Sequence, residues 1–176
     1  MSWYLWNGLY WYKKLGENFW DKIPKSTKRI FLSLNSQEIQ LVRFNQKDAD
    51  VLTKFIKQAK QRDIKVELLL GDPYWALSKY RTNLINIIKN LQRFPFDGIQ
   101  LDIEKSQLPL KDRHLWENGI VKTISEVKKN TSLPIGLSMN YKEAENKILL
   151  NELKKAGLNE VILMVYTTNT KRIIEI

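Results

Sequence analysis

Short apolar runs alternate along the chain with longer segments in which apolar residues recur every third or fourth position. A compact apolar run is typical of a buried strand, and the longer recurrence is typical of an amphipathic helix. The sequence therefore predicts strands in six places. They cover residues 3–7, 29–35, 64–72, 96–104, 133–141 and 160–169.

Helices are predicted between these strands from four groups of apolar residues. The groups are Leu52, Phe55, Ile56 and Ala59; Leu84, Ile87, Ile88 and Leu91; Ile120, Ile124 and Val127; and Ile148, Leu149, Leu153 and Ala156. Asp48 is expected to cap the helix that contains Leu52, and Gly157 to end the last helix in the left-handed conformation. The poorly patterned segment between the first two strands predicts only a short helix over 19–22.

Strands separated by helical crossovers imply a parallel sheet, either open and doubly wound or closed into a barrel. The chain has only seven glycines and no Gly-rich phosphate loop, which disfavours the nucleotide-binding doubly wound form. Polar residues instead follow the strand ends, where barrel enzymes assemble their sites. They are Asn7, Asn35, Asp72, Glu104, Asn140 and Tyr166. We therefore expect one α/β domain over 1–176, of the (β/α)8 TIM-barrel type and incomplete, with about six βα units.

The predicted strand over 96–104 carries the candidate chemistry. Side chains alternate along a strand, so Gln100, Asp102 and Glu104 share one face and aliphatic residues take the other. At a rise of roughly 3.3 Å per residue, Asp102 and Glu104 lie about 6.6 Å apart, within reach of one substrate. Two coupled carboxylates can divide into a charged group and a proton donor, so both are candidate catalytic residues. The alternative is that they cap a helix or pair with lysines.

Composition and charge narrow the possible functions. The 176 residues are 43% hydrophobic, enough for one substantial core, and the formal charge is +10. Lysines are spread over every helical segment, which indicates solvated faces and predicts neither a nucleic-acid nor a membrane partner. The N-terminus lacks a signal-peptide pattern, so a cytoplasmic location is the default expectation.

The absence of cysteine and the single His114 exclude thiol chemistry and disfavour both a histidine triad and a multi-histidine metal site. We expect His114 at the surface or at a helix start. No cofactor and no metal site are expected.

The run 97–104, Asp-Gly-Ile-Gln-Leu-Asp-Ile-Glu, resembles the signature of glycoside hydrolase family 18, the chitinase-like barrels, which carry Asp-x-x-Asp-x-Asp-x-Glu on their fourth strand. Residues 164–166, Met-Val-Tyr, are similar to that family's Met-x-Tyr-Asp motif on the sixth strand. The segment through Leu108-Pro109 also looks like uncharacterised bacterial barrels related to glycosidases.

The resemblance implies hydrolysis of glycosidic bonds in an N-acetylated oligosaccharide. Glu104 would be the general acid, Asp102 would orient the N-acetyl group, and Tyr166 would donate a hydrogen bond to it. Further substrate contacts are expected from Gln100, Asn140, Asn35, Trp6 and Met164. Sugar rings could stack on Trp6, Tyr74, Trp75 and Tyr141, although core or rim packing is an alternative for each aromatic residue.

The sequence departs from that family pattern at Gln100, which replaces its second Asp, and at Thr167, which replaces the Asp after the Tyr. The chain also ends before a seventh and an eighth strand, which predicts self-association or pairing with a separate C-terminal piece. A truncated, non-catalytic remnant that binds glycans or a protein partner is therefore the alternative function. A third interpretation, an isomerase or aldolase-type barrel, lacks a well-placed Schiff-base lysine.

Overall fold

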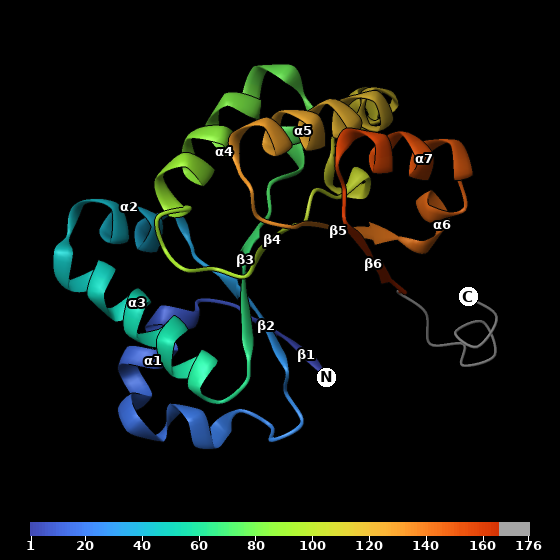
Figure 1. Cartoon of the computed structure of the whole chain (residues 1–176). Coiled ribbons are helices and arrows are strands. Elements are labelled where there is room, and N and C mark those ends of the chain that lie inside the picture. The colour runs from blue at the N-terminus through green and yellow to red at the C-terminus, as the bar shows by residue number, and fades with distance from the viewer. Residues whose placement is uncertain (166–176) are drawn as a thin grey trace. The chain divides into compact units, whose positions relative to one another are not determined.

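The computed structural model describes residues 1–165, and its strands follow one another in chain order. The strands are β1 (Ser2–Leu5), β2 (Arg29–Ser33), β3 (Lys65–Leu70), β4 (Gly98–Leu101), β5 (Ile135–Asn140) and β6 (Glu160–Met164). β2 pairs in parallel with both β1 and β3, and β5 pairs in parallel with β6 (Figure 1). A doubly wound sheet would reverse its strand order, so the sequential order confirms an α/β fold of incomplete barrel type with about six βα units.

The helices are α1 (Gly8–Leu15), α2 (Ser36–Phe44), α3 (Gln46–Gln61), α4 (Ser78–Leu91), α5 (Trp116–Asn130), α6 (Tyr141–Ala144) and α7 (Lys147–Ala156). Short 3-10 helices cover η1 (Gly16–Lys22), η2 (Pro73–Ala76), η3 (Lys105–Gln107) and η4 (Leu110–Leu115). The four strongly periodic segments became α3, α4, α5 and α7, and the weak one lies within η1. α1 and α2 were not predicted, because exposed aromatic and aliphatic residues interrupt their apolar spacing.

Of the two predicted helix caps, the structure confirms one and contradicts the other. Gly157 ends α7 with φ 106°, in the left-handed region, as predicted. The prediction for Asp48 was wrong, since Asn45 caps α3 by accepting a hydrogen bond from the backbone N–H of Lys47. Asp48 lies in the first turn of α3 instead and pairs with Lys13.

The chain divides into two compact units. The first unit comprises Met1–Leu70 and Ile87–Gln100, and the second comprises Gly71–Asn86 and the chain from Leu101 onward.

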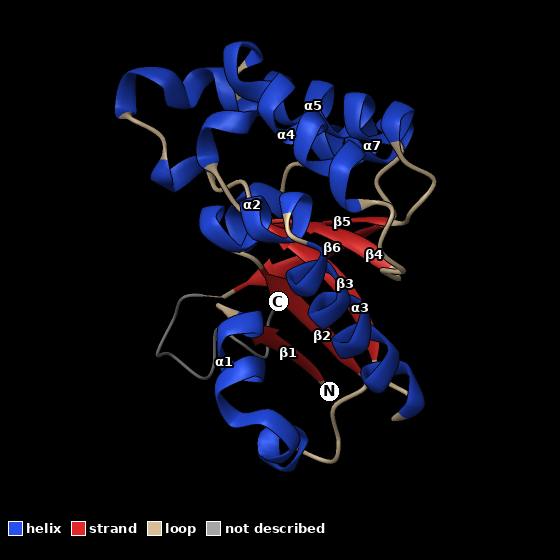
Figure 2. Ribbon diagram, turned by 90° about the vertical axis from the view of Figure 1, so that its left-hand side faces the viewer, coloured by secondary structure: helices blue, strands red, loops and turns tan. Residues whose placement is uncertain are grey.

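In the first unit, one face of β1–β3 is aliphatic because registered residues of parallel strands share a face. Leu32 of β2 pairs with Leu68 of β3, and both are almost fully buried. α1 and α3 lie on the same side of these strands (Figure 2). Phe55 of α3 packs edge-on against Tyr12 of α1, with 5.2 Å between ring centroids. This core anchors α1 beside the ends of the strands.

In the second unit, the buried side chains of Trp116 and Thr123 bind α5 to the segments that contain Ile103 and Trp75. The indole Nε1–H of Trp116 donates to the Ile103 carbonyl at 2.8 Å, and the Thr123 hydroxyl donates to the Trp75 carbonyl at 2.8 Å. A Cβ added to Gly119 would lie 2.2 Å from the Ala76 carbonyl oxygen, so only glycine allows this close approach. α5 also packs against α7.

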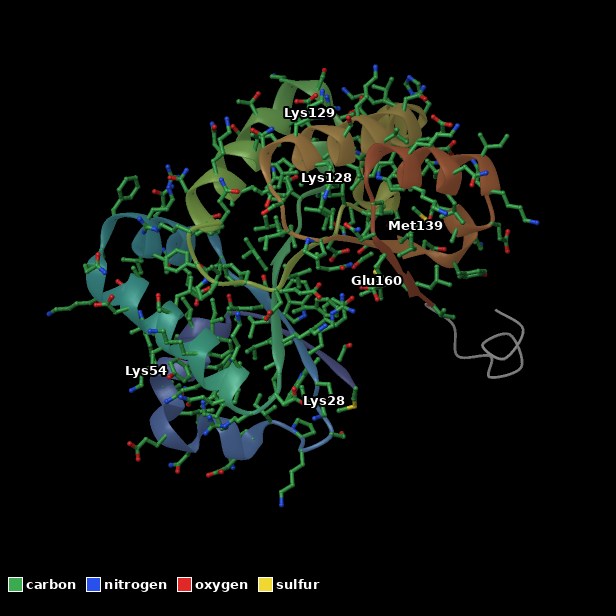
Figure 3. All side chains as sticks on the ribbon, viewed as in Figure 1. Lys28, Lys54, Lys128, Lys129, Met139 and Glu160 are labelled. Atoms are coloured by element: carbon green, nitrogen blue, oxygen red, sulfur yellow. The ribbon has the colours of Figure 1, made fainter. Side chains whose placement is uncertain are left out.

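The lysines that give the chain its charge lie on solvated helix faces. Lys54 on α3 and Lys128 and Lys129 on α5 are all exposed (Figure 3). His114 is exposed in η4, as expected. Among the helices of the described residues, none combines the length and the apolar character needed to cross a membrane.

Candidate functional site

The candidate carboxylates follow β4 directly. β4 ends at Leu101, so the predicted strand over 96–104 was too long, but Glu104 still has extended backbone angles, with φ −79° and ψ 128°. Ile103 is fully buried, whereas Asp102 and Glu104 on either side of it are only partly buried. The alternation read from the sequence therefore continues beyond the last ladder hydrogen bond.

Asp102 lies in an environment that favours its protonated form. Its Oδ1 atom is buried and has no hydrogen-bond partner among the described residues. Burial, and next the negative charge of Glu104, raise the pKa of Asp102 from 3.8 to about 6. A carboxyl group with this pKa can gain and lose a proton close to neutral pH.

Gly71 lies against Asp102. A Cβ added at position 71 would lie 3.2 Å from the Asp102 carbonyl oxygen and 3.9 Å from its Oδ2. A larger side chain would therefore press on the backbone that positions the carboxyl group. Glycine at this position keeps space beside the group.

Glu104 is held by the short helix that follows it. Its Oε1 accepts a hydrogen bond from Gln107 Nε2 at 2.7 Å, and its Oε2 accepts one from the Ser106 hydroxyl at 3.2 Å. The neighbouring Lys105 pairs with Glu117 at 3.0 Å. Glu104 is therefore orientated by η3, and it acts on Asp102 through its charge.

Asn140 lies near Glu104 in the same unit. Its side-chain oxygen accepts from the Lys142 backbone N–H at 3.0 Å and so caps α6. Asn140 and Glu104 line one crevice of about 10 Å³, together with Ser138 and Met139. That volume suits a single water molecule rather than a substrate. Met164, also in this unit, ends β6 half-buried, and Tyr166 lies outside the described residues.

Three other predicted substrate contacts, Gln100, Asn35 and Trp6, belong to the first unit. Gln100 is fully buried on β4. Asn35 caps α2 by accepting from the Glu38 backbone N–H at 2.9 Å. Trp6 is 53% exposed and stacks on Tyr4, with 6.5 Å between ring centroids. The positions of these side chains do not show whether they contact a sugar.

Sequence reasoning missed the residues that support the pair. Ser106 and Gln107 hold Glu104, Trp116 holds the Ile103 carbonyl, and Gly71 leaves space beside Asp102. The sequence signal for Ser106 and Gln107 was that both are polar and follow Glu104 within one helical turn. Within residues 1–165, no group of three or more His, Cys, Asp or Glu side chains could hold a metal ion.

Comparisons with known proteins agree on the fold alone. No protein-family model and no curated protein sequence matches the chain. A solved structure of the carboxyl transferase domain from Rhizobium etli pyruvate carboxylase, with 3-hydroxypyruvate, is similar at 12% identity and a TM-score of 0.50, over 93% of this chain and 33% of that one. The Y628A domain with pyruvate is similar at the same identity and score, over 87% of this chain and 31% of that one. The chain therefore spans about a third of the length of these structures.

These comparisons overturn the resemblance to glycoside hydrolase family 18. The two solved structures named above are carboxyl transferase domains, and no family model supports a glycosidase or a chitinase. The physical reason lies in the motif itself, because a parallel barrel-type strand requires alternating aliphatic residues and tolerates polar residues at its carboxyl end. A short pattern of this kind reports the strand type and its position, and does not identify the reaction.

Proposed function

We propose that Asp102 and Glu104 form an acid–base pair at the carboxyl end of β4, in which Asp102 carries the exchangeable proton. The proposal rests on the buried Oδ1 of Asp102, which has no hydrogen-bond partner within residues 1–165, and on the pKa of this group, which burial and then the charge of Glu104 raise to about 6. A general acid or base works best when its pKa is near the working pH. Barrel-type folds also assemble their reacting groups at the carboxyl ends of strands.

The charge of the pair restricts its substrate. Once Asp102 has lost its proton, two carboxylates lie side by side, so an anionic substrate would be repelled. The proposal therefore takes a neutral polar molecule as substrate. Asp102 would remove a proton from it or deliver one to it. Burial keeps the Asp102 pKa high, and Glu104, fixed by Ser106 and Gln107, would add to this effect through its charge.

The first test locates the proton. Carboxyl-carbon NMR should follow the titration of Asp102 in the wild type and in Glu104→Gln. The wild-type midpoint is expected near pH 6, and the variant's midpoint lower, because the neutral amide removes the repulsive charge. Glu117→Gln is the matched control, since Glu117 pairs with Lys105 in the same unit. A midpoint near 4 in the wild type would contradict the proposal.

The second test measures proton removal from a neutral substrate. Nitrobenzisoxazole is a neutral molecule whose ring N–O bond breaks when a base removes its ring C–H proton, which gives a coloured phenolate. The wild type should open this ring at a rate that rises with pH through about 6, and Asp102→Asn should reduce the rate by about 100-fold or more. Asp112→Asn is the control variant. Equal rates for all three proteins would overturn the catalytic proposal.

A second candidate function is ligand binding without turnover. It is favoured by the hydrogen bonds to Glu104, because a carboxylate that already accepts from Ser106 and Gln107 also serves the loop as a structural group. A raised Asp102 pKa without ring opening would favour this second candidate.

A further inference from the structure

A surface hollow lies in the first unit, at the carboxyl ends of β1 and β2. Its volume is about 440 Å³, within the range of small-molecule pockets. Its lining comes from the turn after β1, from α1, and from the start of α2. It includes Asn7, Tyr10, Trp11, Asn35, Gln37 and Glu38.

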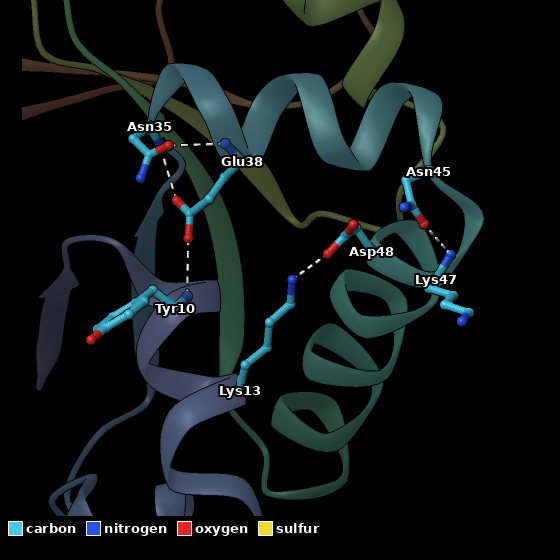
Figure 4. A network of polar contacts seen from close by, with 7 residues as sticks. All are labelled: Tyr10, Lys13, Asn35, Glu38, Asn45, Lys47 and Asp48. Atoms are coloured by element: carbon cyan, nitrogen blue, oxygen red, sulfur yellow. Dashed lines mark hydrogen bonds and ion pairs between the residues drawn. The ribbon is translucent and has the colours of Figure 1, made fainter.

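A single buried carboxylate joins the two helices beside this hollow. Glu38 is 8% exposed, and its Oε1 accepts from the Tyr10 backbone N–H of α1 at 3.0 Å. Its Oε2 accepts from the Asn35 backbone N–H at 2.9 Å, which completes a capping box at the start of α2 (Figure 4). The hydrogen bonds of Glu38 therefore fix α1 and the start of α2, which line the hollow, relative to each other before a ligand binds.

Two backbone features set α1 close to the strands. Asn7 adopts the left-handed conformation, with φ 50°, and begins α1. A Cβ on Gly8 would lie 2.2 Å from Leu32 Cδ1, so glycine allows the start of α1 to contact β2 closely. Asn35 Nδ2 donates to Asn7 Oδ1 at 3.1 Å and links the two turns.

The charged groups at the hollow are already engaged. Lys13 pairs with Asp48, and both oxygens of Glu38 accept backbone N–H groups. An anionic ligand would meet the negative charge of Glu38 where the helix N-termini would otherwise attract it. Besides Lys14, which lies over the Trp11 ring, the groups left to meet a ligand are neutral. The amides of Asn7 and Gln37 offer both donors and acceptors.

Two exposed aromatic side chains supply an apolar surface in the same hollow. Tyr10 is 52% exposed and Trp11 is 41% exposed, and their rings meet edge to face with 5.2 Å between centroids. Lys14 Nζ lies 5.1 Å from the centroid of Trp11, so it covers part of this ring system. The combination of exposed ring surface with neutral amides suits a ligand that is apolar on one side and rich in hydroxyls at its edges.

We infer that this hollow binds a neutral saccharide, with a sugar ring against Trp11 and hydroxyl groups on the amides of Asn7 and Gln37. The inference does not depend on the acid–base pair, because none of its residues belongs to that pair. Its failure and the failure of the proposed function are therefore separate results.

The test is NMR titration of the tryptophan indole N–H and side-chain amide signals, with glucose, maltose and cellobiose as neutral probes. We expect at least one of them to shift the signals of Trp11 and Gln37. Glucuronate, which has the shape of glucose and a negative charge, should bind about tenfold more weakly than glucose. Trp11→Ala should weaken binding of the neutral probe about tenfold or more.

Two further variants keep the inference falsifiable. Gln37→Ala removes an exposed amide that no fold contact requires, and it should weaken binding even if Trp11→Ala fails to fold. Phe44→Ala removes a 76% exposed ring at the end of α2, outside the hollow, and it should leave binding unchanged. The inference is overturned if no neutral probe shifts the Trp11 and Gln37 signals, if glucuronate binds as tightly as glucose, or if the folded hollow variants bind like the wild type.

Discussion

At the residue scale, the two candidate carboxylates differ in what surrounds them. Glu104 accepts hydrogen bonds from Ser106 and Gln107, whereas the buried Oδ1 of Asp102 has no partner among the described residues. An unpartnered carboxylate in a partly dry site is destabilised in its charged form. We therefore propose Asp102 as the group that carries the exchangeable proton, whereas the family resemblance implied Glu104.

This environment predicts a dependence of stability on pH. The folded-state pKa of Asp102 is raised from 3.8 to about 6, so between these values the folded state binds more protons than the unfolded state, and stability falls as pH rises. Asp102→Asn mimics the protonated group. It should change little at about pH 4 and stabilise the fold by about 2 kcal/mol at about pH 8, once solvent screening of a partly exposed carboxyl is allowed for.

Urea unfolding at both pH values measures this difference. Asp63→Asn is a suitable control, because a hydrogen bond from Lys28 and the charge of Lys28 lower the Asp63 pKa. This substitution should therefore not raise the free energy of unfolding at high pH. An equal effect of Asp102→Asn at both pH values would show that the Asp102 pKa is not raised.

At the element scale, the starts of α1 and α2 depend on Glu38. Its carboxylate accepts hydrogen bonds from backbone N–H groups at both starts, and it is buried. The first N–H groups of a helix have no partner within the helix, so a side chain or water must satisfy them. One residue thus stabilises two helices that their own hydrophobic patterns did not predict.

Glu38→Ala should therefore destabilise the protein by about 2 to 4 kcal/mol, because it removes a capping box and leaves two partly buried donors without acceptors. Gln40→Ala, at an exposed position on the same helix, should change the free energy of unfolding by less than about 0.5 kcal/mol. Urea denaturation with both variants checks the prediction. Similar small effects would mean that water replaces Glu38 at no cost.

At the scale of the whole molecule, the strand order within residues 1–165 gives β1 a strand neighbour on one side only. Backbone groups on such an edge can pair with another chain. Self-association therefore stays a prediction. The net charge of +10 opposes it, since like-charged copies repel, and salt weakens this repulsion.

Sedimentation equilibrium over a range of protein concentrations tests this prediction at low and at high salt. The average mass should exceed the 20.8 kDa of one chain and should rise with concentration, more so at high salt. A mass that stays at one chain under all conditions would contradict it.

The sequence by itself determined the strand positions, four of the longer helices, the barrel-type order and the place of Asp102 and Glu104 after β4. These features follow from local periodicity, since the alternation of Ile99, Leu101 and Ile103 with polar residues is visible without any partner. The helices α1 and α2 were missed because exposed aromatic and aliphatic residues interrupt their apolar spacing. The hydrogen bond from Tyr10 to Glu38, which supports the start of α1, spans 28 residues and is not visible in local periodicity.

Only the tertiary structure decided which carboxyl group is shielded from solvent and where the hollow beside α1 and α2 forms. Both depend on burial and on contacts between segments distant in sequence, such as Gly71 beside Asp102 and Asn7 beside Asn35. A spacing pattern carries no information about solvent exposure around a single oxygen atom, and that exposure sets its pKa. For the same reason, a motif that resembles a glycosidase strand located the strand and its terminal carboxylates, but the family that it indicated was wrong.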